Sequence, residues 1–229
     1  MSSGHSKWIP VRAWQSYLAL LPEIGVLVAL LKVIEGLHIH PGWLAGLMAL
    51  GLNFIVYFII MRDLSQVIGG RPKESRFQKF ATVMGPILMI QFLTGYGLLA
   101  LGANGAIVRL APDLLLILML AVFGHWLCPI IVREPERAEF PSVVRGASSF
   151  VKMIGLWVLG VIVLTVLAYL VDQCAQLMVG IPGSLEVLRG LWSIFITAAG
   201  YFISALFATV IWTAWIKDHP EDDRALAEI

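Results

Sequence analysis

The chain has 229 residues, of which 59% are hydrophobic and only 14% charged, and its mean hydropathy is +0.86. Soluble domains are about 45–50% apolar and about 25% charged, so a water-soluble protein of this length is excluded and a lipid bilayer must solvate the excess apolar surface. The net charge of +1 gives no argument for nucleic acid as a partner, and none is expected. The expected partners are membrane lipids and other membrane subunits or further copies of the chain.

Six apolar segments are each long enough, at about 20 residues, to cross a hydrocarbon core of about 30 Å. The first contains Pro22, which predicts a kink because proline removes a helix hydrogen bond. Turns rich in glycine and proline, or charged elbows, separate the segments, and residues 102–111 are expected to form a loop. The sequence therefore predicts an all-α, polytopic transmembrane bundle. It forms a single integral membrane domain over residues 1–229, with spans at residues 11–33, 43–61, 80–101, 113–132, 151–171 and 187–216.

The distribution of basic residues predicts the orientation of these spans. The elbow between the fourth and fifth spans carries Arg133, Arg137 and Arg145, and basic residues near membrane ends mark the cytoplasmic side. With both termini placed inside, 13 of the 16 Lys and Arg residues are cytoplasmic, and the exceptions are Lys32, Arg109 and Arg189. We therefore expect an inner (plasma) membrane protein whose N- and C-termini are both cytoplasmic.

Small residues at four-residue spacing occur in two of the predicted spans. Such stripes let helix backbones approach closely, either within one chain or at a dimer face. They consist of Gly42 and Gly46 in the second span and of Gly200, Ser204 and Ala208 in the sixth. The sequence leaves both kinds of packing open.

Two short segments resemble one another and indicate an internal repeat. Residues 11–18 read VRAWQSYL and residues 144–151 read VRGASSFV. Both place V-R-small, then a serine, then an aromatic residue at equal spacing, and both enter a span from the predicted inner side. Spans one, three and five would then each begin a hairpin, as in transporters built from repeated units.

Glu23 is the acidic residue that lies deepest in the predicted first span. It is about ten residues, or about 15 Å, from the start, and an acid at that depth is a functional candidate by default. Asn53, Gln91 and Thr94 could line a polar path with it, or could form hydrogen bonds between helices. In the alternative, residues 11–22 lie along the membrane interface and leave Glu23 shallow.

His125 is the one histidine inside a predicted span. A bis-histidine haem needs two axial ligands, so one chain cannot form it, whereas a single ligand to a pigment stays open. His38 and His40 lie beside Glu35 in a turn and offer only a weak zinc spacing. We expect no metal, and the sequence does not identify a cofactor.

No motif of a known catalytic site occurs in the chain. P-loop, H-E-x-x-H, G-x-S-x-G and C-x-x-C patterns are all absent from the sequence, and the loops are too short for a folded catalytic domain. The sequence therefore predicts no enzyme. The first functional hypothesis is a non-catalytic membrane-complex subunit or an assembly or lipid-interacting protein. The alternatives are a small proton- or solute-coupled transporter using Glu23 and a pigment-binding subunit using His125.

The fourth span ends in Cys128-Pro129-Ile130-Ile131-Val132-Arg133-Glu134, and the fifth begins after Arg145-Gly146-Ala147-Ser148-Ser149-Phe150. This run resembles a group of six-span bacterial membrane proteins, the YciC-like proteins and the membrane domain attached to some glycerophosphoryl diester phosphodiesterases. In that group, a proline, small apolar residues and a glutamate end span four, and an Ala-x-x-x-Ser-like helix start precedes span five. The resemblance implies a six-span fold and no particular activity, and the phosphodiesterase chemistry is not carried over.

Overall fold

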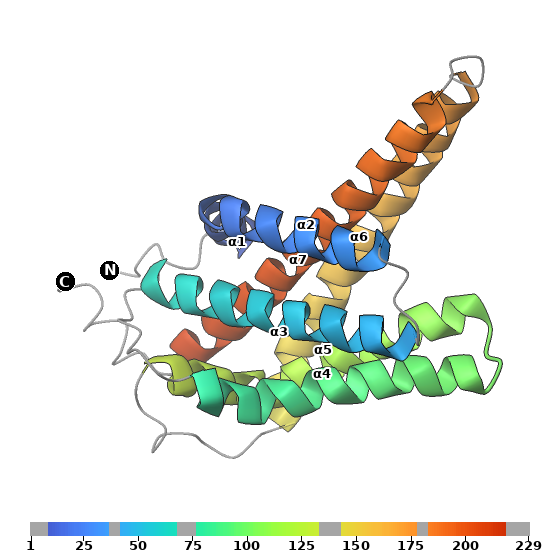
Figure 1. Ribbon diagram of the computed structural model, residues 1–229. Helices are drawn as coiled ribbons and strands as arrows, with labels where there is room; N and C mark the ends of the chain where they lie inside the picture. Colours follow the sequence, from blue (N-terminus) through green and yellow to red (C-terminus); the bar gives the residue numbers. More distant parts are fainter. Residues whose placement is uncertain (1–8, 37–41, 68–76, 133–142, 178–182, 219–229) are drawn as a thin grey trace.

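The computed structural model describes residues 9–36, 42–67, 77–132, 143–177 and 183–218 (Figure 1). Helices make up the secondary structure of these residues and no strand occurs among them, which confirms the all-α prediction. The helices are α1 (Ile9–Ala19), α2 (Leu21–Gly36), α3 (Gly42–Val67), α4 (Phe77–Ala100), α5 (Gly105–Val132), α6 (Val143–Leu177) and α7 (Ser184–Asp218).

Five of these helices, α3 to α7, are each long and apolar enough to cross a membrane. Helices α1 and α2 pass the same test only together, as a pair bent by 71°. The described residues therefore contain five candidate spans, or six if the bent pair counts as one. An all-helical protein with about five candidate membrane-spanning helices has the architecture of a multi-pass membrane protein, as the composition predicts.

The bundle is organised around the C-terminal half of α7. Every residue from Ser204 to Trp212 is buried, and α7 contacts α1, α2, α3, α5 and α6. Helices α3, α4 and α5 run side by side, whereas α6 and α7 cross them obliquely (Figure 1). The start of α4 and the ends of α3, α5 and α7 lie at the same end of the bundle, on the left in Figure 1.

The predicted first span is broken at Leu20. Pro22 has no N–H to donate to the carbonyl of Leu18, and its ring clashes with that carbonyl in a continuous helix. The amide of Leu20 still bonds Ser16 at 3.1 Å, and Ile24 begins the next series by bonding Leu20 at 2.9 Å. Pro22 is then the second residue of α2, a position that needs no amide donor. The predicted kink is therefore a break between two short helices.

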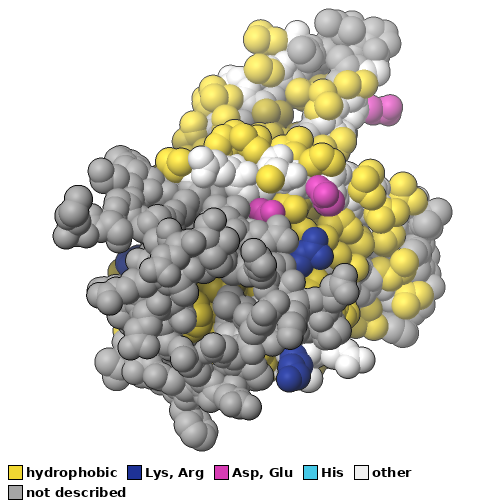
Figure 2. All heavy atoms as spheres, turned by 90° about the vertical axis from the view of Figure 1, so that its left-hand side faces the viewer, with side chains coloured by type: hydrophobic (Ala, Val, Ile, Leu, Met, Phe, Trp, Pro, Cys, Tyr) yellow, Lys and Arg dark blue, Asp and Glu magenta, His cyan; other side chains and the backbone are white. Residues whose placement is uncertain are grey.

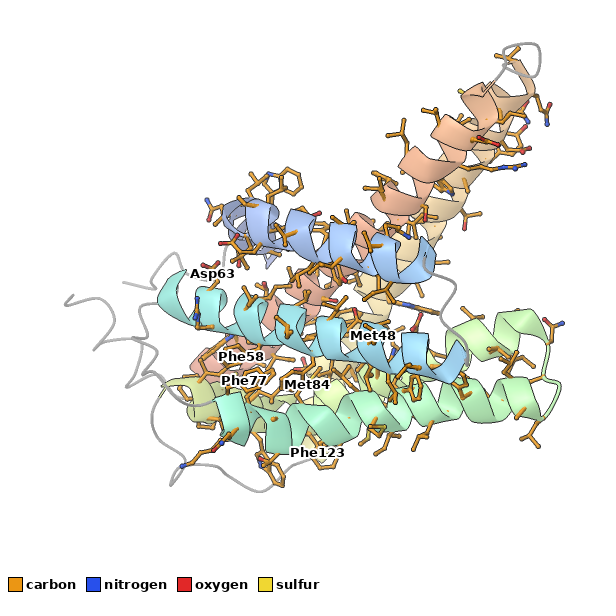
Figure 3. All side chains as sticks on the ribbon, viewed as in Figure 1. Met48, Phe58, Asp63, Phe77, Met84 and Phe123 are labelled. Carbon is orange, nitrogen blue, oxygen red and sulfur yellow. The ribbon has the colours of Figure 1, made fainter. Side chains whose placement is uncertain are left out.

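Side chains from α1 bond to two other helices. The hydroxyl of Ser16 donates to Oδ2 of Asp63 at 2.6 Å, near the end of α3 (Figure 3). The hydroxyl of Tyr17 donates to the carbonyl of Ala198 on α7 at 3.2 Å, and its ring lies 5.4 Å from that of Phe202. One face of α1 thus packs on the bundle, and the ring of Trp14 also lies 5.7 Å from that of Phe202, while Val11 and Leu18 are 48% and 47% exposed.

The loop expected at residues 102–111 is much shorter, because α5 begins at Gly105. Gly102 has a φ of +70° and ends α4 with the amide of Ala103 bonded to Leu98 and its own amide bonded to Leu99, both at 3.0 Å. Asn104 then caps α5, since its Oδ1 accepts from the amide of Ala106 at 2.9 Å. The helix therefore begins eight residues before Asp113, the predicted start of the fourth span, and this residue lies well inside α5.

Helices α6 and α7 have 35 residues each, so α6 starts before the predicted residue 151 and ends after residue 171. The early start brings the second copy of the sequence repeat into the helix. Its small residue Gly146 and its Ser149 are buried, as are the equivalent Ala13 and Ser16 of α1. The four buried positions give the sequence pattern a packing role in both helices.

Candidate functional site

The break at Leu20 changes the depth argument for Glu23. This residue is the third of α2, its side chain is exposed, and it belongs to the first turn after the bend. Asn53 on α3 and Gln91 on α4 are half-buried, and no hydrogen bond or ion pair joins Glu23 to either of them among the described residues. Thr94 donates to the carbonyl of Ile90 in its own helix at 2.8 Å.

The predicted packing residues occupy different environments. Gly46 faces α4, where an added Cβ would lie 2.7 Å from the ring of Phe92 and 2.6 Å from the hydroxyl of Tyr96. Ser204 and Ala208 are buried, whereas Gly200 is exposed and has no atom within 4 Å of an added Cβ. The environment of Gly42 lies outside the described residues.

The predicted pigment and zinc ligands are only partly described. His125 belongs to α5, but its side chain lies outside the described residues, as do His38 and His40. No group of three potential metal ligands occurs in the part of the chain that the structure describes. Cys128 is buried and Cys174 is exposed, and both are free thiols.

The structure gathers a different set of polar side chains around Asp113. Nε2 of Gln91 lies 3.5 Å from Oδ1 of Asp113, and the indole of Trp157 on α6 also donates to this carboxyl. The hydroxyl of Tyr57 on α3 is close enough to Asp113 for an electrostatic interaction and is hydrogen-bonded to Ser204 on α7. We call these five residues the Asp113 cluster, and each comes from a different helix.

The short turn between α4 and α5 explains why Gln91 meets Asp113. In an antiparallel helix pair, residues equally far from the turn lie opposite each other. Gln91 is nine residues before the end of α4 at Ala100, and Asp113 is eight residues after the start of α5 at Gly105. The Gly102 terminator and the Asn104 cap therefore set this pairing.

The Asp113 cluster lies well inside the candidate spans. Asp113 is eight residues after the start of its span at Gly105 and eleven before the end at Gly124, which is about 12 Å and about 16 Å along the helix. Polar and ionisable side chains at such depth are costly, face the bundle interior or each other, and mark functional sites. The sequence indicated Gln91 and Ser204 but not Asp113, which was expected at the start of a span. The signal that reveals its depth is Asn104, because a helix capped there extends well beyond Asp113 in both directions.

A second feature is the part of α6 and α7 that leaves the bundle. We call residues 158–177 and 184–200 the outer hairpin, whose far part projects beyond the other helices at the upper right of Figure 1. Its base still contacts the bundle, because Lys32 of α2 donates to Ser193 at 2.6 Å and Tyr17 of α1 donates to the carbonyl of Ala198 at 3.2 Å. The most apolar 18 residues of α6 include none that is buried. Figure 2 shows hydrophobic side chains over much of this projection. They include Leu159, Ile162, Val166, Val187, Leu191 and Ile194.

The length of the outer hairpin explains its oblique course. A helix of 35 residues is about 52 Å long, whereas the hydrocarbon core is about 30 Å thick. A helix that is too long for the bilayer tilts, because tilting shortens its length along the membrane normal. The tilt separates the ends of α6 and α7 from the remaining helices and leaves apolar side chains uncovered.

Comparison of the chain with protein-family models, with curated proteins and with solved structures finds no match.

Proposed function

We propose that the chain is a six-span inner-membrane protein that acts, without catalysis of its own, as a subunit bound to another membrane protein through the outer hairpin. The observation that carries the proposal is the exposed apolar surface of this hairpin outside the bundle. The occupant is a protein with transmembrane helices of its own, because the surface belongs to two of the candidate spans. A YciC-like relationship would fit six spans and adds no activity.

Gly200 supports a close helix contact at this surface. It lies at the base of the outer hairpin, next in the stripe to the buried Ser204 and Ala208, and nothing lies within 4 Å of an added Cβ. A small residue with an uncovered face permits the backbone of a second helix to approach. Lipid chains covering the same surface would not require a small residue there.

We expect Gly200→Leu to abolish binding of the partner while the chain still folds. A photo-crosslinking residue placed at Leu191 is used to capture the partner in membranes, and the captured protein is identified by mass spectrometry. Gly25→Leu is the matched control, because Gly25 is also exposed with nothing within 4 Å of an added Cβ. Capture of lipid alone, or of a protein that Gly200→Leu leaves bound, contradicts the proposal.

The orientation is part of the same proposal. Six spans with basic elbows on one side place both termini in the cytoplasm. A reporter fused after Ile229 that works only in the cytoplasm is therefore expected to be active, and one that works only outside is expected to be silent. The opposite result would contradict the proposed orientation, and a second reporter at the N-terminus would then distinguish five crossings from six inverted ones.

A second candidate is a small proton- or solute-coupled transporter. The observation in its favour is a carboxyl group at membrane depth, which such proteins use to couple transport to ions. The sequence assigned this role to Glu23, but the exposed position of Glu23 moves the hypothesis to Asp113. The pigment hypothesis rests on His125 alone, whose side chain lies outside the described residues.

A further inference from the structure

We propose that Asp113 is a protonation site inside the membrane, at which Gln91 and Trp157 hold the carboxylate when the proton leaves. In this step the carboxylate takes up one proton to become a carboxylic acid, and its charge changes by one. The inference goes beyond both proposed functions, because a titrating site can serve a subunit as well as a transporter.

The partners of Asp113 favour an exchangeable proton. The indole N–H of Trp157 can only donate a hydrogen bond, and the amide Nε2 of Gln91 also donates, so both stabilise the charged form of the carboxyl. Burial at membrane depth opposes the charged form. Two neutral donors offset part of this cost, and neither of them carries a charge that would hold Asp113 permanently ionised.

Protonation also changes the direction of hydrogen bonding in the Asp113 cluster. The carboxylate only accepts, whereas the carboxylic acid donates one hydrogen bond. Tyr57 lies close enough to interact with Asp113 and is bonded to Ser204, so a proton on Asp113 acts on a contact between α3 and the buried half of α7. The site thereby connects the charge of one side chain to helix packing at the centre of the bundle.

The titratable and charged groups near Asp113 define the competing explanation, which is a permanent ion pair. Among the described residues of the helices packed against α5, Tyr57 is the titratable group that interacts with Asp113, while Gln91, Trp157 and Ser204 do not titrate. On α5 itself, Arg109 stands four residues before Asp113, a spacing that permits an ion pair, and its side chain lies outside the described residues. A permanent ion pair with Arg109 would keep the carboxylate charged.

The test is labelling with dicyclohexylcarbodiimide, an apolar reagent that adds to protonated carboxyl groups. The full-length protein in lipid nanodiscs is treated over a series of pH values, and the modified residue is identified by mass spectrometry. Because Asp113 is only half-buried, the reagent can reach it from the lipid. We expect Asp113 to be labelled, with labelling that falls as the pH rises, and Asp113→Asn to remain unlabelled. The exposed carboxyls of Asp172 and Glu186 serve as internal comparisons.

Substitution of the hydrogen-bond donors Gln91 and Trp157 distinguishes a carboxyl that gains and loses a proton from one that is only reactive toward the reagent. Trp157→Phe removes the N–H and keeps an aromatic ring, and it is expected to raise labelling at neutral pH by about tenfold, the effect of one lost hydrogen bond to a charged group. Gln91→Leu is expected to act in the same direction, and Trp192→Phe, outside the cluster, to have no effect. Size-exclusion profiles show that each variant is folded.

Three results would overturn the proposal. They are an unlabelled Asp113 at every pH, labelling that does not change with pH, and labelling that appears only in Arg109→Gln. The last result would show that Arg109 holds the carboxylate as an ion pair. None of these readouts depends on a partner or on uptake of a solute, so failure here is distinct from failure of the functions proposed above.

Discussion

Phe80→Ala is expected to lower the free energy of unfolding of the bundle by about 3 kcal/mol, the lower part of the range for removing a buried phenylalanine. Phe80 is fully buried on α4, and its ring lies 5.4 Å from that of Phe54 and 5.3 Å from that of Phe58 on α3. The substitution leaves a cavity whose walls lose dispersion contacts. The lower part of the range applies because an apolar side chain released from the bundle enters lipid rather than water.

Phe77→Ala is the matched control on the same helix. Phe77 contacts the same two rings, each at 5.1 Å, and Figure 3 shows it beside Phe58 between α3 and α4. Its side chain is 45% exposed, so lipid fills the space that the ring leaves, and we expect about 1 kcal/mol or less. Unfolding by sodium dodecyl sulfate in mixed micelles measures both. Equal effects of the two substitutions would show that Phe80 does not lie in a sealed core.

Gly146→Ala is expected to destabilise the protein by about 1–3 kcal/mol, the cost of overpacking a well-packed interior. An added Cβ would lie 2.7 Å from the carbonyl oxygen of Ala121 and 3.1 Å from its carbonyl carbon. Because these atoms belong to the backbone of α5, no side-chain rotation relieves the clash. Helices α5 and α6 must separate, and the contact of Trp157 with Asp113 is expected to loosen with them.

Gly155→Ala supplies the comparison within α6. Gly155 is exposed and has nothing within 4 Å of an added Cβ, and alanine favours a helix over glycine by about 0.5–1 kcal/mol. This substitution is therefore expected to leave stability unchanged or to raise it. Thermal unfolding in the same detergent distinguishes the pair, and a tolerated Gly146→Ala would mean that α5 and α6 cross at a larger distance.

Local patterns in the sequence predicted most of the helices and part of the site. Apolar length identified every helix from α3 to α7, and Pro22 identified the break in the first span. The start of α5 was missed because Gly102, Gly105 and Pro112 together look like a loop. The cap formed by Asn104 and the terminator formed by Gly102 show how the chain instead turns within four residues.

Glu23 and Asp113 show why the environment of an acidic side chain is harder to predict than a span. Depth along one helix was counted correctly for a straight span, but the 71° bend at Leu20 altered the count for Glu23. Asp113 was expected at a helix end because the start of α5 was also predicted from neighbouring residues alone. Whether an acid faces lipid, water or another polar side chain depends on neighbouring helices, which no single segment specifies.

The sequence by itself determined that lipid is the solvent of this protein, how many long apolar helices it contains and which of their ends carry positive charge. These properties follow from the length and polarity of continuous segments. Only the tertiary structure decided that Gln91, Asp113 and Trp157 meet, that Gly146 touches the backbone of α5 and that the outer hairpin stands apart. Such contacts join residues far apart in the chain, and they depend on the rotation and tilt of each helix against its neighbours.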